Sequence, residues 1–544
     1  MTAKQYIEQQ LKRYLQQINR DNFEIILEKP KIEKFGDLSS NLPLQLAGIL
    51  KKKPREIAQA IISTIQPDLH YLEKIEIAGP GFINFYITEA ALYDQMLEIL
   101  ELKENYGRSS KGNGAKSLIE FISANPTGPL TIGHGRGAVL GDTIARLMEA
   151  IGYTVTREYY FNNAGRQMRI LADSVKQRYL ELLGEKITFP DDYYQGDYII
   201  DIAKKVYEEK GESLKNEQDL SYFKTIAETE VFKDIRRTIE RLKFKMDVYY
   251  NEQSLYDDKK IDAVVSLLRE KGLVADRDGA TWFLTSKLGK EQDRVIIKST
   301  GEPTYRLPDI AYHREKFERG YSLIIDIFGA DHIDTYPDVL SALKAMGYDE
   351  AKVKVLIHQF VTLTEGAAKI KMSTRKANFV TLDELMDEVG EDVTRFFFLT
   401  RHMNSHLNFD LTLAKSESDD NPVYYVQYAH ARICSIIRFG EEKGIKIDLD
   451  PPLELLTEED EINLIKHLIQ YPQIVEESAL SFEPHRLVNH LLEIATRFHR
   501  FYTTCRVITG NNLLTQARLA LCEVCRIVFA NGCEILGINA PTQM

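Results

Sequence analysis

The first hundred residues show two kinds of hydrophobic pattern. Apolar residues recur every three or four positions in Lys4–Ile18 and Leu42–Leu50, which predicts two helices. The segment from Ile75 to Ile87, IEIAGPGFINFYI, instead alternates apolar and polar positions, and Gly79–Gly81 interrupts it, which predicts a β-hairpin. We therefore expect residues 1–105 to form a separate α+β domain.

The pattern then changes twice between Leu118 and Ala150. The apolar run Leu118–Ile122 is typical of a buried strand, Ser123–Pro129 is a turn of small residues and proline, and a long helical pattern follows. Glycines stand around the start of that helix, at positions 128, 133, 135 and 137. A helix start with free N–H groups and an open backbone can bind phosphate. Glycines in such a place can also serve only the close packing of a helix on a strand.

The rest of the chain divides by its dominant pattern. A second strand and a polar loop, YTVTREYYFNNAGRQ, complete a first α/β segment that ends near residue 165, and residues 166–279 are mostly helical and highly charged. Residues 280–390 return to strand-like runs with a helix from about Asp309, and residues 391–544 are almost wholly helical. This order predicts an α/β fold with a parallel sheet, whose ligand lies at the carboxyl ends of the strands, followed by a helix bundle.

Composition excludes several classes of protein. At 544 residues the chain is too long for one core, and 44% hydrophobic and 28% charged residues are typical of a globular protein. No apolar run reaches the length of a membrane span, and the amphipathic start does not resemble a signal peptide, so we expect a cytoplasmic protein without a membrane partner. The net charge of −12 means that any contact with RNA must use local patches.

The five cysteines argue against a disulfide framework, because their number is odd and they lie in helical pattern in the last fifth of the chain. Cys522 and Cys525 form a CxxC pair, but no second pair accompanies it. We therefore expect no zinc site and no other protein-bound metal.

A cationic segment, KIKMSTRKAN, runs from Lys369 to Asn378, just ahead of a predicted helix at Leu382–Val389. Cationic side chains in such a loop can neutralise the charge that develops on a leaving pyrophosphate. Lys371, Arg375 and Lys376 are the candidates for that role.

The two segments resemble a known pair of motifs. TIGH, at Thr131–His134, and KMSTR, at Lys371–Arg375, resemble the HIGH and KMSKS signatures of class I aminoacyl-tRNA synthetases. Further segments resemble the arginyl-tRNA synthetase family, in the same order from end to end: GPGFINF, SANPTGPLTIGHGRGA, PTYRLPDIAYHREKFERG, FGADH, KMSTRKANFVTLDEL and NPVYYVQYAHARI.

The resemblance implies a Rossmann-like class I core in two halves, residues 106–165 and 280–390, separated by a connective insertion at 166–279. It makes residues 1–105 an added tRNA-binding domain and residues 391–544 a helical anticodon-binding domain. The implied reaction activates L-arginine with ATP and Mg²⁺ and transfers arginine to the 3′ end of tRNA specific for arginine. We expect a monomer.

The resemblance also implies roles for individual residues. The catalytic residues would be His134, Lys371, Arg375 and Lys376. The ATP site would include Gly133, His134, Gly137, Asp331, His332, Met372 and Ser373. Arginine would be held by Glu120, Asn125, Glu252, Tyr305 and Asp309, and tRNA would be contacted by Phe82, Asn84, Tyr425 and Arg432.

Two positions depart from the family motifs. Thr131 stands where the first histidine of HIGH is usual, and Thr374 stands where the second lysine of KMSKS is usual. We expect Arg375 or Lys376 to supply the missing charge, and His134 with the backbone N–H groups to stabilise ATP.

The residues by themselves leave simpler roles open. Asp309 could cap a helix, Phe82 could lie in a core with Asn84 capping a turn, and the tyrosines of the helical region could be core residues. Another class I synthetase, a nucleotidyltransferase or a non-catalytic RNA-binding relative are the rival functions. Two carboxylates placed for a planar guanidinium, those of Asp309 and Glu252, favour arginine.

Overall fold

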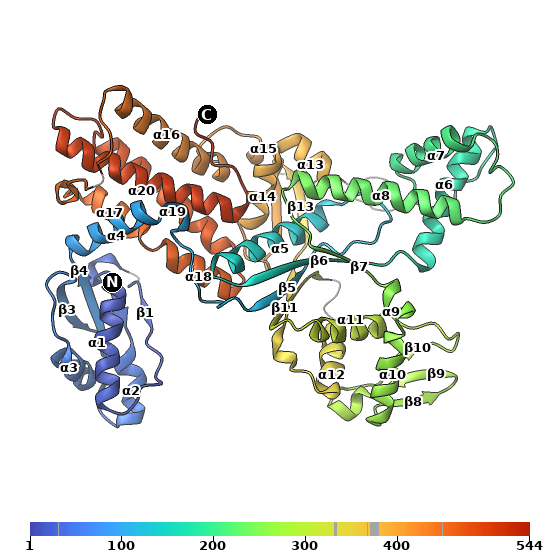
Figure 1. Ribbon diagram of the computed structural model, residues 1–544, viewed down its shortest axis with the longest axis horizontal. Helices are drawn as coiled ribbons and strands as arrows, with labels where there is room; N and C mark the ends of the chain where they lie inside the picture. Colours follow the sequence, from blue (N-terminus) through green and yellow to red (C-terminus); the bar gives the residue numbers. More distant parts are fainter. Residues whose placement is uncertain (31, 331–334, 367, 370–379, 449) are drawn as a thin grey trace.

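The protein is elongated, with the chain's two ends on one side and a helical insertion on the other (Figure 1). The computed structural model describes residues 1–544 except 31, 331–334, 367, 370–379 and 449. The colours of Figure 1 distinguish an N-terminal domain in blue and a bundle of helices in orange and red. Between them in the sequence come a central sheet and its two insertions, in green and yellow.

The N-terminal domain packs three helices against one antiparallel sheet. The helices are α1 (Ala3–Gln17), α2 (Leu42–Leu50) and α3 (Pro54–Thr64). The sheet has the order β1-β2-β4-β3, with β1 at Leu27–Glu28, β2 at Leu38–Ser40, β3 at Leu72–Ala78 and β4 at Phe82–Ile87. The two predicted helices and the predicted hairpin are confirmed. Helix α4 (Glu89–Leu102) then leads out of this domain.

The centre of the molecule is a five-stranded parallel sheet, ordered β12-β11-β5-β6-β7. Its strands are β5 (Lys116–Glu120), β6 (Thr154–Phe161), β7 (Val248–Asn251), β11 (Leu323–Gly329) and β12 (Val353–His358). The long predicted helix is α5 (Ile132–Ala150), which connects β5 to β6. The strand order reverses between β5 and β11, and ligands of open parallel sheets bind at such a reversal, beside the carboxyl ends of the strands. The predicted α/β fold is confirmed.

Two insertions interrupt this sheet. Helices α6 (Gly165–Leu182), α7 (Asp197–Lys210) and α8 (Ser221–Arg241) lie between β6 and β7 and project to one side (Figure 1). Between β7 and β11 the chain forms α9 (Gln253–Asp257), α10 (Lys260–Glu270), an antiparallel sheet of β8 (Val274–Arg277), β9 (Ala280–Phe283) and β10 (Arg294–Ile297), and α11 (Arg306–Glu318). Residues 166–279 therefore contribute one strand, β7, to the central sheet. This strand has only four residues, too few for its pattern to be recognised in the sequence.

The remaining elements join the sheet to the bundle. Helix α12 (Tyr336–Met346) precedes β12, and a small sheet follows from β13 (Val361–Glu365), β14 (Ala368–Lys369) and β15 (Leu407–Asp410), with α13 (Leu382–Val389), α14 (Glu391–Leu399) and α15 (Leu411–Ala414) around it. The bundle is formed by α16 (Pro422–Glu442), α17 (Glu459–Leu468), α18 (Tyr471–Ser481), α19 (His485–Thr504) and α20 (Asn512–Leu536). Throughout the described ranges, every helix is too short or too polar to cross a membrane.

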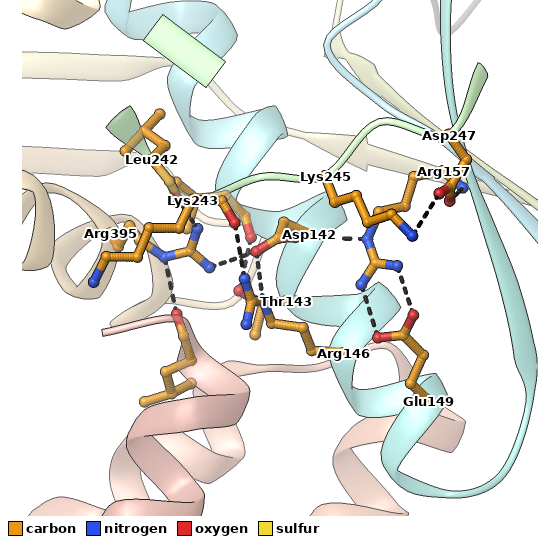
Figure 2. Close-up of polar contacts among 12 residues, drawn as sticks. Asp142, Thr143, Arg146, Glu149, Arg157, Leu242, Lys243, Lys245, Asp247 and Arg395 are labelled. Carbon is orange, nitrogen blue, oxygen red and sulfur yellow. Dashed lines mark hydrogen bonds and ion pairs between the residues drawn. The ribbon is translucent and has the colours of Figure 1, made fainter. Parts of the chain in front are cut away.

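A buried arginine fixes the bundle and the insertion to helix α5 (Figure 2). Arg395 of α14 is 1% exposed, and its guanidinium lies 2.7 Å from the carboxylate of Asp142 on α5. It also donates to the carbonyl oxygens of Leu242, just after α8, and Leu536, at the end of α20, at 2.7 and 3.0 Å. Gly537 has φ +72°, and a Cβ there would lie 2.1 Å from the guanidinium. The position of α5 is therefore set by three distant parts of the chain.

Candidate active site

The start of α5 is open and presents a histidine. Thr131 precedes the helix, and its N–H donates to Nδ1 of His134 at 3.1 Å. Because Nδ1 accepts this bond, the neutral ring carries its proton on Nε2, where it can be donated. Gly133 is exposed, and the nearest atom to a Cβ built on it is Oγ1 of Thr131 at 3.6 Å. This helix start can therefore receive a phosphate group on its N–H groups.

Gly137 has a different neighbour from the one predicted. It is buried, and a Cβ there would lie 2.7 Å from Nε2 of His358, at the end of β12. The need for glycine at this position comes from a histidine side chain packed against the helix. The end of β12 therefore packs against this turn of α5, and the assignment of Gly137 to the ATP site stays a prediction.

The helix start adjoins the end of the predicted cationic loop. Thr131 and Thr381 form an antiparallel bridge, and the N–H of Leu382 donates to the carbonyl oxygen of Leu130 at 2.8 Å. The start of α5 is thus joined directly to Thr381 and Leu382, about 250 residues later in the sequence and just after the predicted loop. The predicted residues Lys371, Met372, Ser373, Arg375 and Lys376 of the loop, and Asp331 and His332 after β11, lie outside the described residues.

A carboxylate follows β7 at the same edge of the sheet. Glu252 is 8% exposed, and its two oxygens accept hydrogen bonds from the hydroxyl of Tyr160 at 2.5 Å and the amide of Asn162 at 2.8 Å. Burial raises the pKa of Glu252, whereas both hydrogen bonds favour its ionised form and oppose that rise. The carboxylate is therefore held in a fixed orientation by donors from strand β6 and the turn after it.

The pKa of the Tyr160 hydroxyl depends on the other acidic groups of the site. Burial raises the pKa of its hydroxyl, and the negative charges of Glu252, Asp309 and Glu120 raise it further. Three of the five residues predicted to hold arginine therefore influence the pKa of one hydroxyl group, and Glu252 contacts it directly. Sequence reasoning missed Tyr160 and Asn162. The available signal was their spacing, because alternate residues of a strand share one face of the sheet.

Asp309 lies in the first turn of α11, which begins at Arg306, three residues before the predicted start. The cap position belongs to Tyr305, so the simpler reading of Asp309 as a helix cap is wrong. Tyr305 itself is 80% exposed. Tyr305 precedes the helix and is open to solvent, so its predicted contact with arginine stays a prediction.

The two residues that flank the first turn are both engaged. Asn125 accepts the N–H of Asn162 at 3.0 Å and donates to Gln167 at 3.0 Å, so it is linked through Asn162 to Glu252. Glu120 is only 3% exposed, and its oxygens accept from Ser123 at 2.8 Å and from the ammonium of Lys316 at 2.5 Å. A carboxylate oxygen has two lone pairs, so each oxygen retains capacity for one more donor.

A cavity of about 1190 Å³ opens beside this edge, between the turn after β5, the end of β6 and helix α8. Its walls include Pro129, Phe161 and Tyr249. This volume is at the upper end of the range for small-molecule sites. Within the part of the chain that the structure describes, three or more metal-ligating side chains nowhere gather, and all five cysteines are free.

The predicted RNA contacts of the N-terminal domain separate into two classes. Phe82 begins β4 and is 37% exposed, so its ring is available for stacking. Asn84 is 4% exposed and accepts a hydrogen bond from Ser39 at 2.8 Å. The hairpin therefore does not expose Asn84 as a contact with tRNA would require. Asn84 lies on the same face of β4 as Phe82, opposite the core residue Ile83, and it pairs with Ser39 of β2.

The tyrosines of α16 line a partly exposed surface of the bundle. Tyr425 lies 4.8 Å from the ring of His499 on α19, and Tyr424 and Tyr428 stack on each other at 6.0 Å. Arg432 is exposed and lies 4.8 Å from the ring centre of Tyr502. All of these tyrosines are partly buried, and Tyr425 and Tyr502 pack against the core with part of each ring exposed, so a core role and an RNA contact both remain open.

Comparison with known proteins places each region in one family. Residues 2–87 match the model described as arginyl tRNA synthetase N terminal domain, residues 95–404 match tRNA synthetases class I (R), catalytic domain, and residues 426–544 match DALR anticodon binding domain. The arginine–tRNA ligase of Desulfotalea psychrophila is 54% identical over 95% of this chain and 94% of its own. That of Salinibacter ruber is 48% identical over 99% and 100%. The structure of Thermus thermophilus arginyl-tRNA synthetase shares the fold, with a TM-score of 0.80, 22% identity and 99% coverage of both chains.

Proposed function

The chain belongs to the class I arginyl-tRNA synthetases, and we propose that its residues Glu252 and Asp309 select arginine by binding the guanidinium group. The enzyme activates L-arginine with ATP and transfers it to tRNA specific for arginine. The observation that supports the assignment is the buried carboxylate of Glu252, which Tyr160 and Asn162 hold in a fixed orientation; the negative charge of Asp309 also raises the pKa of the Tyr160 hydroxyl. A guanidinium is planar and carries five donors, so it pairs best with carboxylates held in fixed orientations.

We assign the binding of the ammonium and carboxylate groups of arginine to the turn that follows β5. We assign its ammonium group to Glu120 and its carboxylate to Asn125, both at the carboxyl edge of β5. Each side chain has hydrogen-bonding capacity beyond its present partners. Tyr305, which is exposed in the absence of substrate, has no assigned contact.

The chemical step needs little more than positioning and charge. The carboxylate of arginine attacks the α-phosphate of ATP, pyrophosphate leaves, and a terminal ribose hydroxyl of tRNA then takes the arginyl group. We assign phosphate stabilisation to the N–H groups near Gly133 and to Nε2–H of His134 on one side. On the other side we assign pyrophosphate neutralisation to Lys371, Arg375 and Lys376, with Mg²⁺ arriving on the phosphates of ATP.

The remaining nucleotide contacts are assigned from sequence. Met372 and Ser373 of the loop and Asp331 and His332 after β11 complete the ATP site. The bridge between Thr131 and Thr381 supports the loop assignment, because it keeps the end of the loop beside the start of α5.

We assign the tRNA contacts to Phe82 in the N-terminal domain and to Tyr425 and Arg432 on α16, whose rings and cation are accessible. The five-part division predicted from sequence is retained, with β7 as a strand of the catalytic sheet. We propose a monomer, since every assigned substrate contact comes from one chain, and a cytoplasmic location, to which five free cysteines are suited.

Citrulline tests the proposed selection of arginine. It has nearly the shape of arginine, but a neutral ureido group replaces the guanidinium, so two carboxylates would lose their cation. We expect charging of tRNA with citrulline to be at least about 100-fold less efficient than with arginine, measured as kcat/KM. Comparable charging of both amino acids would show that the carboxylates of Glu252 and Asp309 do not read the guanidinium.

A further inference from the structure

Three buried carboxylates lie in a row across the middle of the parallel sheet. Asp326 on β11 is the register partner of Glu120 on β5, and Glu120 is in turn the partner of Glu158 on β6. They are 0%, 3% and 0% exposed. Like charges opposite each other on neighbouring strands repel, and burial makes the repulsion stronger. We call Asp326, Glu120 and Glu158 the carboxylate row.

Helix α11 supplies the compensating charges from above the row. Lys316 is fully buried, and its ammonium lies 2.5 Å from Glu120 and 2.6 Å from Asp326. Arg319 donates to Glu158 at 2.8 Å, and Nε2 of His313 lies 2.9 Å from Asp326. Burial alone raises the pKa of Asp326, but the charges of Lys316 and His313 outweigh it and hold that pKa well below its usual range. All three carboxylates of the row are therefore contacted by side chains from one face of one helix.

The same helix carries a residue of the guanidinium site. Asp309 lies in the first turn of α11, seven residues before Lys316, a rise of about 10 Å. Nδ1 of His313 lies 2.8 Å from the carbonyl oxygen of Asp309, so His313 joins that turn to Asp326 of the row. Helix α11 therefore contacts Glu120, which we assign to the ammonium group of arginine. It also carries Asp309, which we assign to the guanidinium group.

We propose that α11 sets the length of the amino acid that the site accepts, with Lys316 and His313 as positioning residues. Lys316 holds Glu120 at one end, and His313 holds the turn of Asp309 at the other. On this proposal the separation between Glu120 and Asp309 is fixed, and the two cationic groups of a bound amino acid must fit it. This inference rests on the assignment of Glu120 and Asp309 in the proposed function.

A merely structural role for the row leads to a different expectation. If Lys316 only neutralised buried charge, its loss would lower the thermal stability and the fraction of active protein. The molecules that remained active would bind arginine as the parent does and would reject shorter and longer homologues equally well. Length discrimination is therefore the quantity that separates the two roles.

The test uses Lys316→Met in the full chain, with active sites counted by titration. Pyrophosphate exchange is measured, with uncharged tRNA specific for arginine present, with arginine and with its homologues one methylene shorter and one longer. One methylene is worth roughly 10- to 200-fold in kcat/KM in a well-formed site. We expect the parent to discriminate within that range and the variant to fall to about one tenth of the parent's ratio. The KM for arginine should rise at least about tenfold, while the KM for ATP stays within about twofold.

Two further variants keep the test decisive. If Lys316→Met yields no folded protein, Lys316→Met with Asp326→Asn removes one charge of each sign and leaves the net charge of the row unchanged. The same loss of discrimination is expected from it. Arg314→Gln is the matched control, because Arg314 lies on α11 and pairs at 2.8 Å with Glu318, away from the row. It should behave as the parent does.

The positioning role would be overturned if either Lys316 variant matched the parent both in its discrimination between arginine and the homologues and in its KM for arginine. That result leaves the proposed function standing, since the parent would still activate arginine. An Asp309 variant that bound arginine normally would instead overturn the site assignment itself.

Discussion

The double variant Arg375→Ala with Lys376→Ala is expected to form arginyl-adenylate about 100- to 1000-fold more slowly than the parent, with little change in arginine affinity. Loss of a donor that acts on the charge of the transition state has a cost of this size. Thr374 stands where the family has its second lysine, so one of the next two cations must take that role. The single-turnover rate with saturating arginine, ATP and tRNA measures the effect directly.

The matched control for this pair is Lys290→Ala, which removes an exposed lysine outside the loop and should leave the rate unchanged. An unchanged rate in the double variant would show that the compensating charge comes from elsewhere. Lys369, at the end of β14, would then be the next candidate.

Asp309→Ala should reduce kcat/KM for arginine roughly 30-fold or more and leave the KM for ATP near that of the parent. Removing one partner of a desolvated ion pair costs about 2 to 5 kcal/mol, and each 1.4 kcal/mol corresponds to about a tenfold change. The effect should fall on arginine alone, because Asp309 lies on α11 and the phosphate-binding helix start lies on α5. Steady-state pyrophosphate exchange with each substrate varied in turn separates the two.

Glu318→Ala provides the comparison for Asp309→Ala. Glu318 is an exposed acidic residue at the far end of the same helix, so its loss changes the net charge of α11 equally. It should leave both KM values unaltered. Equal use of arginine by the Asp309 variant and the parent would show that the guanidinium is bound elsewhere.

Much of the fold could be predicted because its elements have strong local patterns. The helix at Ile132–Ala150 and the hairpin of β3 and β4 follow from periodicity and glycine positions alone. Strand β7 could not be found, since four residues between two helical regions carry too little pattern.

The candidate site divides in the same way. His134 and Glu252 both lie at the carboxyl edge of the sheet, His134 in the first turn of the helix that follows β5 and Glu252 directly after β7. Exposure was harder to predict: Tyr305 is open to solvent and Asn84 is buried, because each depends on where its element starts or which strand it pairs with.

The carboxylate row could not be recognised from sequence, since it depends on register. Asp326 and Glu158 each occur once in an apolar strand, and nothing local indicates that they flank Glu120. The spacing of His313, Lys316 and Arg319 along one face of α11 was a visible signal, but its meaning requires the strands beneath it.

We propose that the site formed by α5, β7 and α11 activates arginine. The most direct measurement is exchange of labelled pyrophosphate into ATP, with purified full-length protein and each amino acid in turn, with and without uncharged tRNA specific for arginine. We expect exchange with arginine and with no other amino acid, and only when tRNA is present. Bound RNA can stabilise the arrangement of the site that chemistry needs. Absence of arginine-dependent exchange in the presence of tRNA, or equal exchange with lysine, would contradict it.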